Sequence, residues 1–263
     1  MTDASPAWVV ELCGLPGVGK TYVAGRLREH CLRLGVGLHP ADELVSAATP
    51  LPRRAARKSL LVTTEMLTRP GPSVHAVAAI RASRQPHLRN VVSWCVQWLV
   101  TQRLLARARR VGGAHLFDEG PLQALWSIGL RGDVTGLLRP ETHRLLAPEV
   151  PNLLVVVDAP LDTIARRLTA RPSKHSRTQR LAGGELRAEL AHGKDLLDRL
   201  VAWRQSAVGG NVPVTYVRNL DAGPGSGPDG EIARAADVMV RAAFGGGATP
   251  RGTPRGGSGS RRA

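Results

Sequence analysis

One short stretch near the start of the chain combines glycines, a lysine and a threonine at the spacing of a phosphate-binding loop. Residues 14–21 read G-L-P-G-V-G-K-T, which is a complete G-x-x-x-x-G-K-[ST] pattern. The glycines allow consecutive backbone N–H groups to point at a β-phosphate, the lysine would reach the β- and γ-phosphates, and the threonine hydroxyl would bind Mg²⁺. We therefore predict that ATP or another purine nucleoside triphosphate binds with Mg²⁺ to Gly14, Leu15, Pro16, Gly17, Val18, Gly19, Lys20 and Thr21.

A phosphate-binding loop lies between a strand and a helix, and the segments on either side of this motif predict that arrangement. Residues 8–13 (WVVELC) form an apolar run that predicts a buried strand, and residues 20–34 carry apolar side chains at helical spacing. A phosphate at the start of that helix would meet unpaired N–H groups and the positive end of the helix dipole. The strand–loop–helix context favours a phosphate-binding loop over a chance glycine turn.

Two acids follow a later strand. Residues 114–117 (AHLF) predict a strand, and Asp118 and Glu119 come directly after it. Open α/β sheets place their ligands at the carboxyl ends of the strands. We predict that Asp118 holds Mg²⁺ or takes a proton from an acceptor hydroxyl, and that Glu119 contacts the acceptor. The alternative is that Asp118 only caps the helix that begins near Pro121.

Basic residues gather after the clearest strand, residues 153–157 (LLVVV). Six cations and no acids lie in residues 166–180. Arg167 and Arg171 are four residues apart, which puts their guanidinium groups on one face of a helix, and Arg177 follows in a loop-like stretch. Because guanidinium groups bind phosphate oxygens and stabilise developing charge, we predict that these three arginines act on the transferring phosphoryl group. A solvated, exposed helix face is the alternative.

The region of residues 50–110 reads as a long helical stretch with basic clusters and two tryptophans, Trp94 and Trp98. A nucleobase could stack on a tryptophan while Gln97 reads its edge, although core packing explains the tryptophans equally well. We predict that contacts to an acceptor molecule come from Glu119, Arg53, Arg84 and Gln97.

Strand-like and helix-like segments alternate along the chain, which argues for a parallel sheet with helices on both faces. A last strand is expected at residues 212–217, a weak one at residues 36–39, and a final helix at residues 231–244. Residues 1–244 are expected to form the folded domain. Residues 245–263, rich in Gly, Pro, Ser and Arg, are expected to form a disordered basic tail.

The chain is strongly basic, with 36 Lys and Arg residues against 21 Asp and Glu and a formal net charge of +15. All but four of the basic residues are arginines. Such an excess is typical of proteins that bind phosphates or nucleic acid, and a genome that favours arginine produces it as well. The local density in residues 166–180, beside the predicted triphosphate site, favours neutralisation of nucleotide phosphates, with nucleic acid as the less favoured partner.

The cysteines and apolar runs exclude several classes of protein. Three widely spaced cysteines indicate neither a disulfide framework nor a zinc site, and we expect buried thiols. The first residues lack a basic segment followed by a long apolar one, so no secretory signal is expected. The longest apolar run, residues 91–100, is too short to span a membrane. We expect a cytoplasmic protein without a membrane partner.

Three segments together resemble a known family. They are GLPGVGKT, the strand-end DEG, and VVVDAPLDTIARRLTAR with the basic stretch that follows it. They resemble the P-loop kinases of the nucleoside and nucleotide kinase superfamily, with thymidylate kinase and the deoxynucleoside kinases nearest in pattern. The resemblance covers residues 9–220. It implies a P-loop NTPase three-layer α/β sandwich with a five-stranded parallel sheet, a helical acceptor-binding region at residues 50–110 and an arginine-rich lid at residues 171–184.

The same resemblance implies roles for single residues. Arg167 and Arg171 match the arginines that flank the lid, Arg177 matches an arginine within it, and Asp118 matches the acid after the third strand. Thymidylate kinases usually have an Asp-Arg pair, and deoxynucleoside kinases a Glu-Arg pair, where this chain has Asp118 and Glu119. The arginine missing from this chain is one that would hold the acceptor or its phosphate.

The predicted activity is that of an ATP-dependent small-molecule kinase with Mg²⁺. Its acceptor would be a nucleoside, a nucleotide or another hydroxylated compound. The sequence does not give the oligomeric state, and a homodimer is compatible with it. An NTP-binding ATPase or switch protein that acts on a macromolecule, such as nucleic acid, is the alternative. A polynucleotide 5′-kinase is a third reading, in which the basic tail would take part.

Overall fold

Five parallel strands form one sheet in the order β2-β3-β1-β4-β5. The computed structural model describes residues 7–41, 43–45, 49–140, 150–170, 181–206, 210–220 and 228–244. The strands are β1 (Trp8–Cys13), β2 (Leu38–Pro40), β3 (Ala114–Phe117), β4 (Leu153–Asp158) and β5 (Val214–Arg218). The predicted five-stranded parallel sheet is therefore confirmed, with the phosphate-loop motif between its central strand and the first helix.

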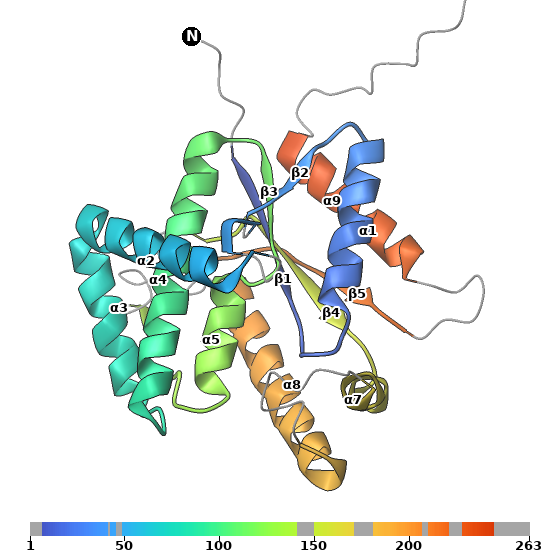
Figure 1. Ribbon diagram of the computed structural model, residues 1–263. Coiled ribbons are helices and arrows are strands. Elements are labelled where there is room, and N and C mark those ends of the chain that lie inside the picture. The colour runs from blue at the N-terminus through green and yellow to red at the C-terminus, as the bar shows by residue number, and fades with distance from the viewer. Residues whose placement is uncertain are drawn as a thin grey trace, which may run out of the picture.

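Helices cover both faces of this sheet (Figure 1). One face carries α1 (Lys20–Arg33) and α9 (Asp229–Phe244). The other carries α4 (Leu88–Val111), α5 (Pro121–Gly129) and α8 (Gly183–Gln205), with α2 (Leu51–Thr68) and α3 (Pro70–Ala82) packed outside α4. A short 3-10 helix, η1 (Glu43–Val45), follows β2, and α7 (Leu161–Thr169) follows β4 and contacts α8. The result is the three-layer α/β sandwich that the sequence predicts.

The central position of β1 follows from its composition and sets the position of the site. All six of its residues are buried, as expected for a parallel strand covered on both faces. It pairs with β3 on one side, where Glu11 lies opposite Phe117, and with β4 on the other, where Cys13 lies opposite Val156. The turn after Cys13 therefore lies at the same sheet edge as Asp118, the residue that follows β3.

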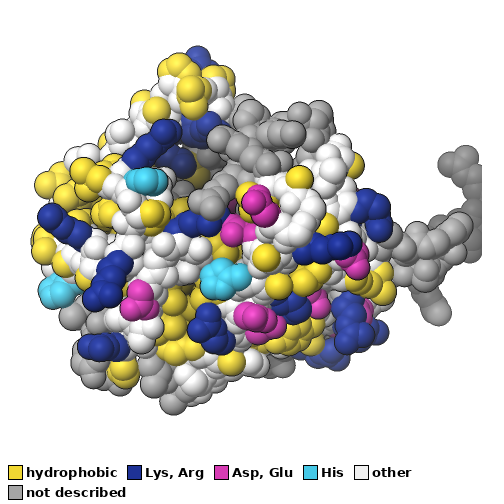
Figure 2. Space-filling model, turned by 90° about the horizontal axis from the view of Figure 1, so that it is seen from below, with side chains coloured by type: hydrophobic (Ala, Val, Ile, Leu, Met, Phe, Trp, Pro, Cys, Tyr) yellow, Lys and Arg dark blue, Asp and Glu magenta, His cyan; other side chains and the backbone are white. Residues whose placement is uncertain are grey.

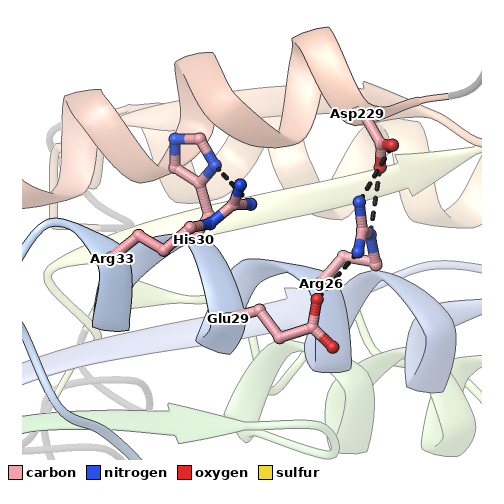
Figure 3. Close-up of polar contacts among 5 residues, drawn as sticks. All are labelled: Arg26, Glu29, His30, Arg33 and Asp229. Atoms are coloured by element: carbon pink, nitrogen blue, oxygen red, sulfur yellow. Dashed lines mark hydrogen bonds and ion pairs between the residues drawn. The ribbon is translucent and has the colours of Figure 1, made fainter.

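The last described helix packs on the first. Arg26 of α1 makes two hydrogen bonds to the carboxylate of Asp229, of 3.1 Å from Nε and 2.9 Å from Nη2 (Figure 3). Arg26 also bonds Glu29 at 2.7 Å, and the Arg26 guanidinium lowers the pKa of Asp229. The two helices bury apolar residues in one core: Val23, Leu27, Cys31, Ile232, Ala236 and Met239. The helix that follows the phosphate loop is thus held from behind by α9.

Two strands lie further along the chain than the sequence suggests. β2 spans residues 38–40 because the Val36 N–H bonds the carbonyl of Cys31 and so belongs to the end of α1. β5 begins at Val214 because the Val212 N–H bonds the Arg204 carbonyl at the end of α8. In both cases the backbone N–H of the residue expected near the start of the strand is hydrogen-bonded to the end of the preceding helix instead.

The helical region after β2 is divided where its prolines predict. α3 begins at Pro70, and the gap between α3 and α4 contains Pro86. No helix in the described part of the chain is long and apolar enough to cross a membrane. Residues 171–180, which make up most of the predicted lid, and the predicted tail from residue 245 lie outside the described residues.

Candidate functional site

The loop between β1 and α1 has a backbone that only glycine accommodates at two positions. Gly17 and Gly19 have φ values of +84° and +96°. A Cβ on Gly19 would lie 2.1 Å from Nδ2 of Asn219, and one on Gly17 would lie 2.8 Å from Cγ of Leu168. Gly19 also caps α1, whose first turn has no acidic residue and no side-chain capping bond. The N–H groups at this helix start are therefore oriented for an anion.

The side chain of Lys20 lies across this loop. Its Nζ donates a hydrogen bond of 2.9 Å to the carbonyl oxygen of Gly14, the first residue of the motif. Lys20 and Thr21 both line a cavity in front of the loop. The ammonium group is thus placed where the loop would hold the phosphates.

The loop is held in place by side chains from two other strand ends. Arg167 of α7 donates from Nη1 to the Val18 carbonyl at 3.0 Å and from Nη2 to the Asn219 carbonyl at 3.2 Å. The Asn219 side chain, just after β5, donates from Nδ2 to the same Val18 oxygen at 2.7 Å. Arg167 does not line the cavity. Its guanidinium thus helps to hold the loop, and its Nη1 would lie 3.7 Å from a Cβ built on Gly19. The predicted action of Arg167 on the phosphoryl group stays a prediction.

The other two arginines of the predicted catalytic set, Arg171 and Arg177, lie outside the described residues. Their predicted action on the phosphoryl group remains a prediction.

Asp118 faces the same cavity from the end of β3. Burial raises the pKa of its carboxyl group, and the positive charge of Lys20 opposes that shift. Its Oδ1 atom is buried and has no hydrogen-bond partner among the described residues. α5 is capped by Gly120 without a side-chain bond, so Asp118 does not serve as the helix cap that was its alternative role.

These oxygens suit a magnesium ion. The Asp118 carboxylate and the Thr21 hydroxyl line one cavity, and Mg²⁺ in nucleotide sites takes one or two protein oxygens and completes its shell with phosphates and water. The buried, unpartnered Oδ1 of Asp118 is an oxygen that a cation would satisfy. No group of three or more His, Cys, Asp or Glu side chains suited to a metal occurs among the described residues, and Mg²⁺ bound with a nucleotide needs none.

The cavity has a volume of about 640 Å³ and continues past the phosphate loop between α4 and α5. Its far end is lined by side chains from both helices: Ser93, Trp94, Gln97, Trp126 and Ser127. The Gln97 amide donates to the Glu119 carboxylate at 3.3 Å, so these two predicted acceptor contacts lie together. A second molecule could therefore occupy this end while phosphates occupy the loop.

The tryptophans of this region divide between the cavity and the core. Trp94 lines the cavity, and its indole N–H is occupied by a bond of 3.2 Å to Gln85. The Trp126 N–H likewise donates to the Gly193 carbonyl at 2.7 Å. Both rings can thus offer a ligand apolar surface but no free donor. Trp98 is only 1% exposed and is a core residue, as the packing alternative predicts.

Two predicted acceptor contacts lie away from the cavity. Arg53 on α2 and Arg84 before α4 are exposed, and neither lines it. The Arg84 charge instead acts on the exposed carboxylate of Asp133. Of the four predicted acceptor residues, the fold brings Gln97 and Glu119 to the site.

A buried acid behind the site was not among the predicted residues. Glu11 of β1 is completely buried, and its Oε1 accepts a hydrogen bond of 3.0 Å from the backbone N–H of Gln123. The Gln123 side chain in turn accepts from the Gly14 N–H at 3.2 Å. A Cβ on Gly120 would lie 2.4 Å from Cδ of Glu11. Glu11 therefore supports both the acidic turn and the start of the phosphate loop.

Glu11 shares its buried surroundings with an arginine. Arg204 of α8 is also fully buried, lies 4.7 Å from the ring of Trp203, and attracts the Glu11 carboxylate. Burial raises the pKa of Glu11 to about 7, while Gln123 and Arg204 oppose that shift. A glutamate inside an otherwise apolar strand is the signal in the sequence that could have revealed this pair.

The raised pKa of Glu11 predicts a pH-dependent stability. Because the folded state holds a proton that the unfolded chain releases near pH 4.5, the free energy of unfolding should fall by about 3 kcal/mol between pH 4.5 and pH 7. In Glu11→Gln this fall should disappear, since the amide does not titrate. Urea unfolding at several pH values measures it. Glu29→Gln, an exposed acid on α1, is the control, and an unchanged slope in Glu11→Gln would contradict the assignment.

Comparison with known proteins finds similarity at the level of the fold. No protein-family model and no curated protein matches the sequence. The solved structure of TT1252 from Thermus thermophilus is 18% identical with a TM-score of 0.42, over 91% of this chain and 98% of that one. A thymidylate kinase from Candida albicans is 12% identical with a TM-score of 0.47, over 90% of this chain and 92% of that one.

Proposed function

We propose that this chain is an ATP-dependent kinase that transfers the γ-phosphoryl group of ATP to a hydroxyl group of a small molecule. The observation that carries the proposal is the continuation of the phosphate-loop cavity, past Asp118, to a pocket lined by Trp94 and Gln97. A nucleotide hydrolase needs room only for water beside the γ-phosphate. A kinase needs a second substrate site in line with the loop, and this cavity provides the space.

Each group near the loop has a role in such a transfer. The loop N–H groups and Lys20 hold the β- and γ-phosphates and stabilise the charge that develops on them. Thr21 and Asp118 would hold Mg²⁺, which neutralises phosphate charge when it is bound. The alternative role for Asp118, in place of metal binding, is to accept the proton of the acceptor hydroxyl, to which a pKa raised by burial is suited. When both substrates are bound they displace water from the cavity, and these electrostatic interactions become stronger.

The polar groups at the acceptor end favour an acceptor without a phosphate. Among the described residues that line the cavity, Lys20 is the one with a positive charge. The phosphates of ATP would bind this lysine, which leaves no cation among these residues for a phosphate on the acceptor. The carboxylate of Glu119, held by Gln97, would repel a phosphorylated acceptor and accept hydrogen bonds from hydroxyl or amino groups. A nucleoside or a similar ring compound with hydroxyl groups fits this end, with Trp94 against its ring.

Surface charge supports a small acceptor over nucleic acid. Figure 2 looks onto the sheet edge that carries the β1–α1 turn, and its basic side chains stand in separate groups with acidic ones between them. Proteins that follow a nucleic-acid backbone usually present a continuous basic stripe. The described residues of this face do not form one.

The proposal is tested by measuring ATP turnover across nucleosides, the matching monophosphates, other hydroxylated compounds and oligonucleotides. A phosphorylated small molecule, identified by mass, is the expected product. Hydrolysis of ATP that nucleic acid stimulates, with no phosphorylated product, would overturn the kinase in favour of an ATPase or switch protein. Phosphorylation of oligonucleotides alone would instead identify a polynucleotide kinase.

The acceptor role of Glu119 leads to a separable kinetic effect. In Glu119→Gln the KM for the acceptor should rise about tenfold, because one charge-assisted hydrogen bond is weakened, while the KM for ATP stays within twofold. Steady-state kinetics with each substrate varied in turn measures both constants. Glu29→Gln should change neither. A rise in the KM for ATP alone would place Glu119 at the nucleotide instead.

A further inference from the structure

A second cavity lies beside β2, which is an edge strand of the sheet, and is separate from the cavity at the phosphate loop. It has a volume of about 420 Å³ and is enclosed by β2, η1, α2, α4 and β3. None of its lining residues lines the cavity at the phosphate loop. The activity proposed above makes no use of it.

Basic side chains from four different elements meet in this cavity. They are His39 of β2, Arg57 of α2, Arg107 of α4 and His115 of β3. Glu43 is the acid among the described lining residues. The site therefore combines four groups that can carry positive charge with one negative charge.

His115 is held in a fixed orientation at this cavity. It is only 9% exposed, and its Nε2 lies 2.8 Å from the carbonyl oxygen of Gly112. Because a carbonyl can only accept, Nε2 carries the hydrogen and Nδ1 is the nitrogen that takes up a proton. The hydrogen bond to Gly112 thus fixes the tautomer. When the ring is protonated, Nδ1 becomes a second hydrogen-bond donor.

The neighbours of His115 make that proton uptake unfavourable. Its ring centroid lies 6.0 Å from that of His39, and Arg107 of α4 lines the same cavity. Burial lowers the pKa of His115, the hydrogen bond to the Gly112 carbonyl opposes that shift, and the positive charges of His39 and Arg107 lower the pKa further. No hydrogen bond or ion pair joins Arg107 to another described residue. An anion in the cavity would relieve this repulsion.

We propose that this cavity binds a small phosphate-bearing anion, at a site separate from the phosphate loop. Guanidinium and imidazolium groups are the side chains that bind phosphate oxygens most directionally. The other lining residues of α4 are apolar, namely Leu104, Ala108 and Val111. With a volume of about 420 Å³, the pocket suits a compact ligand of pyrophosphate or mononucleotide size rather than a polynucleotide strand. Binding is coupled to protonation of His115.

The test uses pyrophosphate and the full chain with Lys20→Ala, so that the phosphate loop contributes little binding. Histidine ring resonances are followed by NMR between pH 6 and pH 7.5, with His115→Gln identifying the His115 signal. We expect a saturable shift of that signal and a rise in its pKa of about half a unit or more. Arg107→Gln should weaken the affinity about tenfold, because a charge-assisted contact is lost.

The matched control is Arg110→Gln. Arg110 lies on the same helix, is exposed and does not line the cavity. The affinity of the Arg110→Gln variant for pyrophosphate should therefore stay within twofold of the parent value. Equal weakening in both variants would reduce the effect to general electrostatics and overturn the site. An unmoved His115 signal would overturn it as well. So would a shift caused by an oligonucleotide but not by pyrophosphate. None of these readouts requires kinase activity.

Discussion

Lys20→Ala should raise the Kd for ATP with Mg²⁺ about 100-fold. The ammonium group lies across the phosphate loop, 2.9 Å from the Gly14 carbonyl, at the start of a helix with no acid in its first turn. Its charge-assisted bonds to phosphate contribute about 3 kcal/mol, which corresponds to the loss expected. Because negative charge also develops on the transferring phosphoryl group in the transition state, kcat/KM should fall by a total factor of roughly 10²–10³. Calorimetry and steady-state kinetics measure the two effects.

Lys58→Ala is the control for this result. Lys58 is half-buried on α2 and does not line the cavity, so ATP should bind that variant normally. Thermal unfolding of Lys20→Ala should stay within a few degrees of the parent, since one partly exposed hydrogen bond is lost. An unchanged Kd for ATP would refute the phosphate loop itself.

Asp118→Asn should lower kcat by about 10²–10⁴ without a loss of stability. The carboxylate is proposed either to hold the metal or to accept the hydroxyl proton, and an amide does both poorly. Its buried Oδ1 atom has no partner among the described residues, and burial raises the pKa of the group. A neutral side chain of the same shape removes that buried charge. The free energy of unfolding should therefore stay the same or rise, as at many catalytic residues.

The pH profile gives the second readout for Asp118. If Asp118 is the proton acceptor, the acid limb of kcat/KM, which reports the free enzyme, should lie above the ordinary Asp range, because burial raises the pKa of its carboxyl group. Glu119→Gln, one residue further on, should leave kcat largely unchanged. A drop in kcat of less than threefold in Asp118→Asn would contradict both of its proposed roles.

The sequence was sufficient for the parts of the site that depend on local patterns. The phosphate loop is read from eight consecutive residues, and its strand and helix follow from adjacent apolar periodicity. Asp118 was predictable because a strand end in a parallel sheet is also a ligand edge. The structure brings Asp118 to the Lys20 end of the sheet through the parallel pairing of β1 with β3. The alternation of elements indicated a parallel sheet but not this strand order.

Tertiary contacts determined what the sequence could not show. The spacing predicts that Arg167 acts on the phosphoryl group, but it could not show that the same guanidinium donates to the carbonyls of Val18 and Asn219. Residue spacing along α7 gives the face of the helix but not what packs against it. Glu11 lies in a strand buried on both faces, so strand periodicity could not reveal that Arg204 faces it from a helix almost two hundred residues later.

The acceptor end shows the same limit. Basic composition made Arg53 and Arg84 candidates, whereas the cavity is lined by Gln97 and Glu119. Which residues of a long helical region reach the site depends on how α2 and α3 pack outside α4, and that packing joins segments with no shared sequence pattern.

The packing of α9 on α1 has a consequence for synthesis of the chain. The helix that carries the phosphate loop leaves the ribosome early, but the helix that covers its apolar face is the last one described. Between those two moments Val23 and Leu27 have no cover from α9, and β1 also waits for β3 and β4 on its two sides. The contacts of α1 and β1 are thus completed only by segments that are translated after them, so the helix that follows the phosphate loop gains its full support late in synthesis.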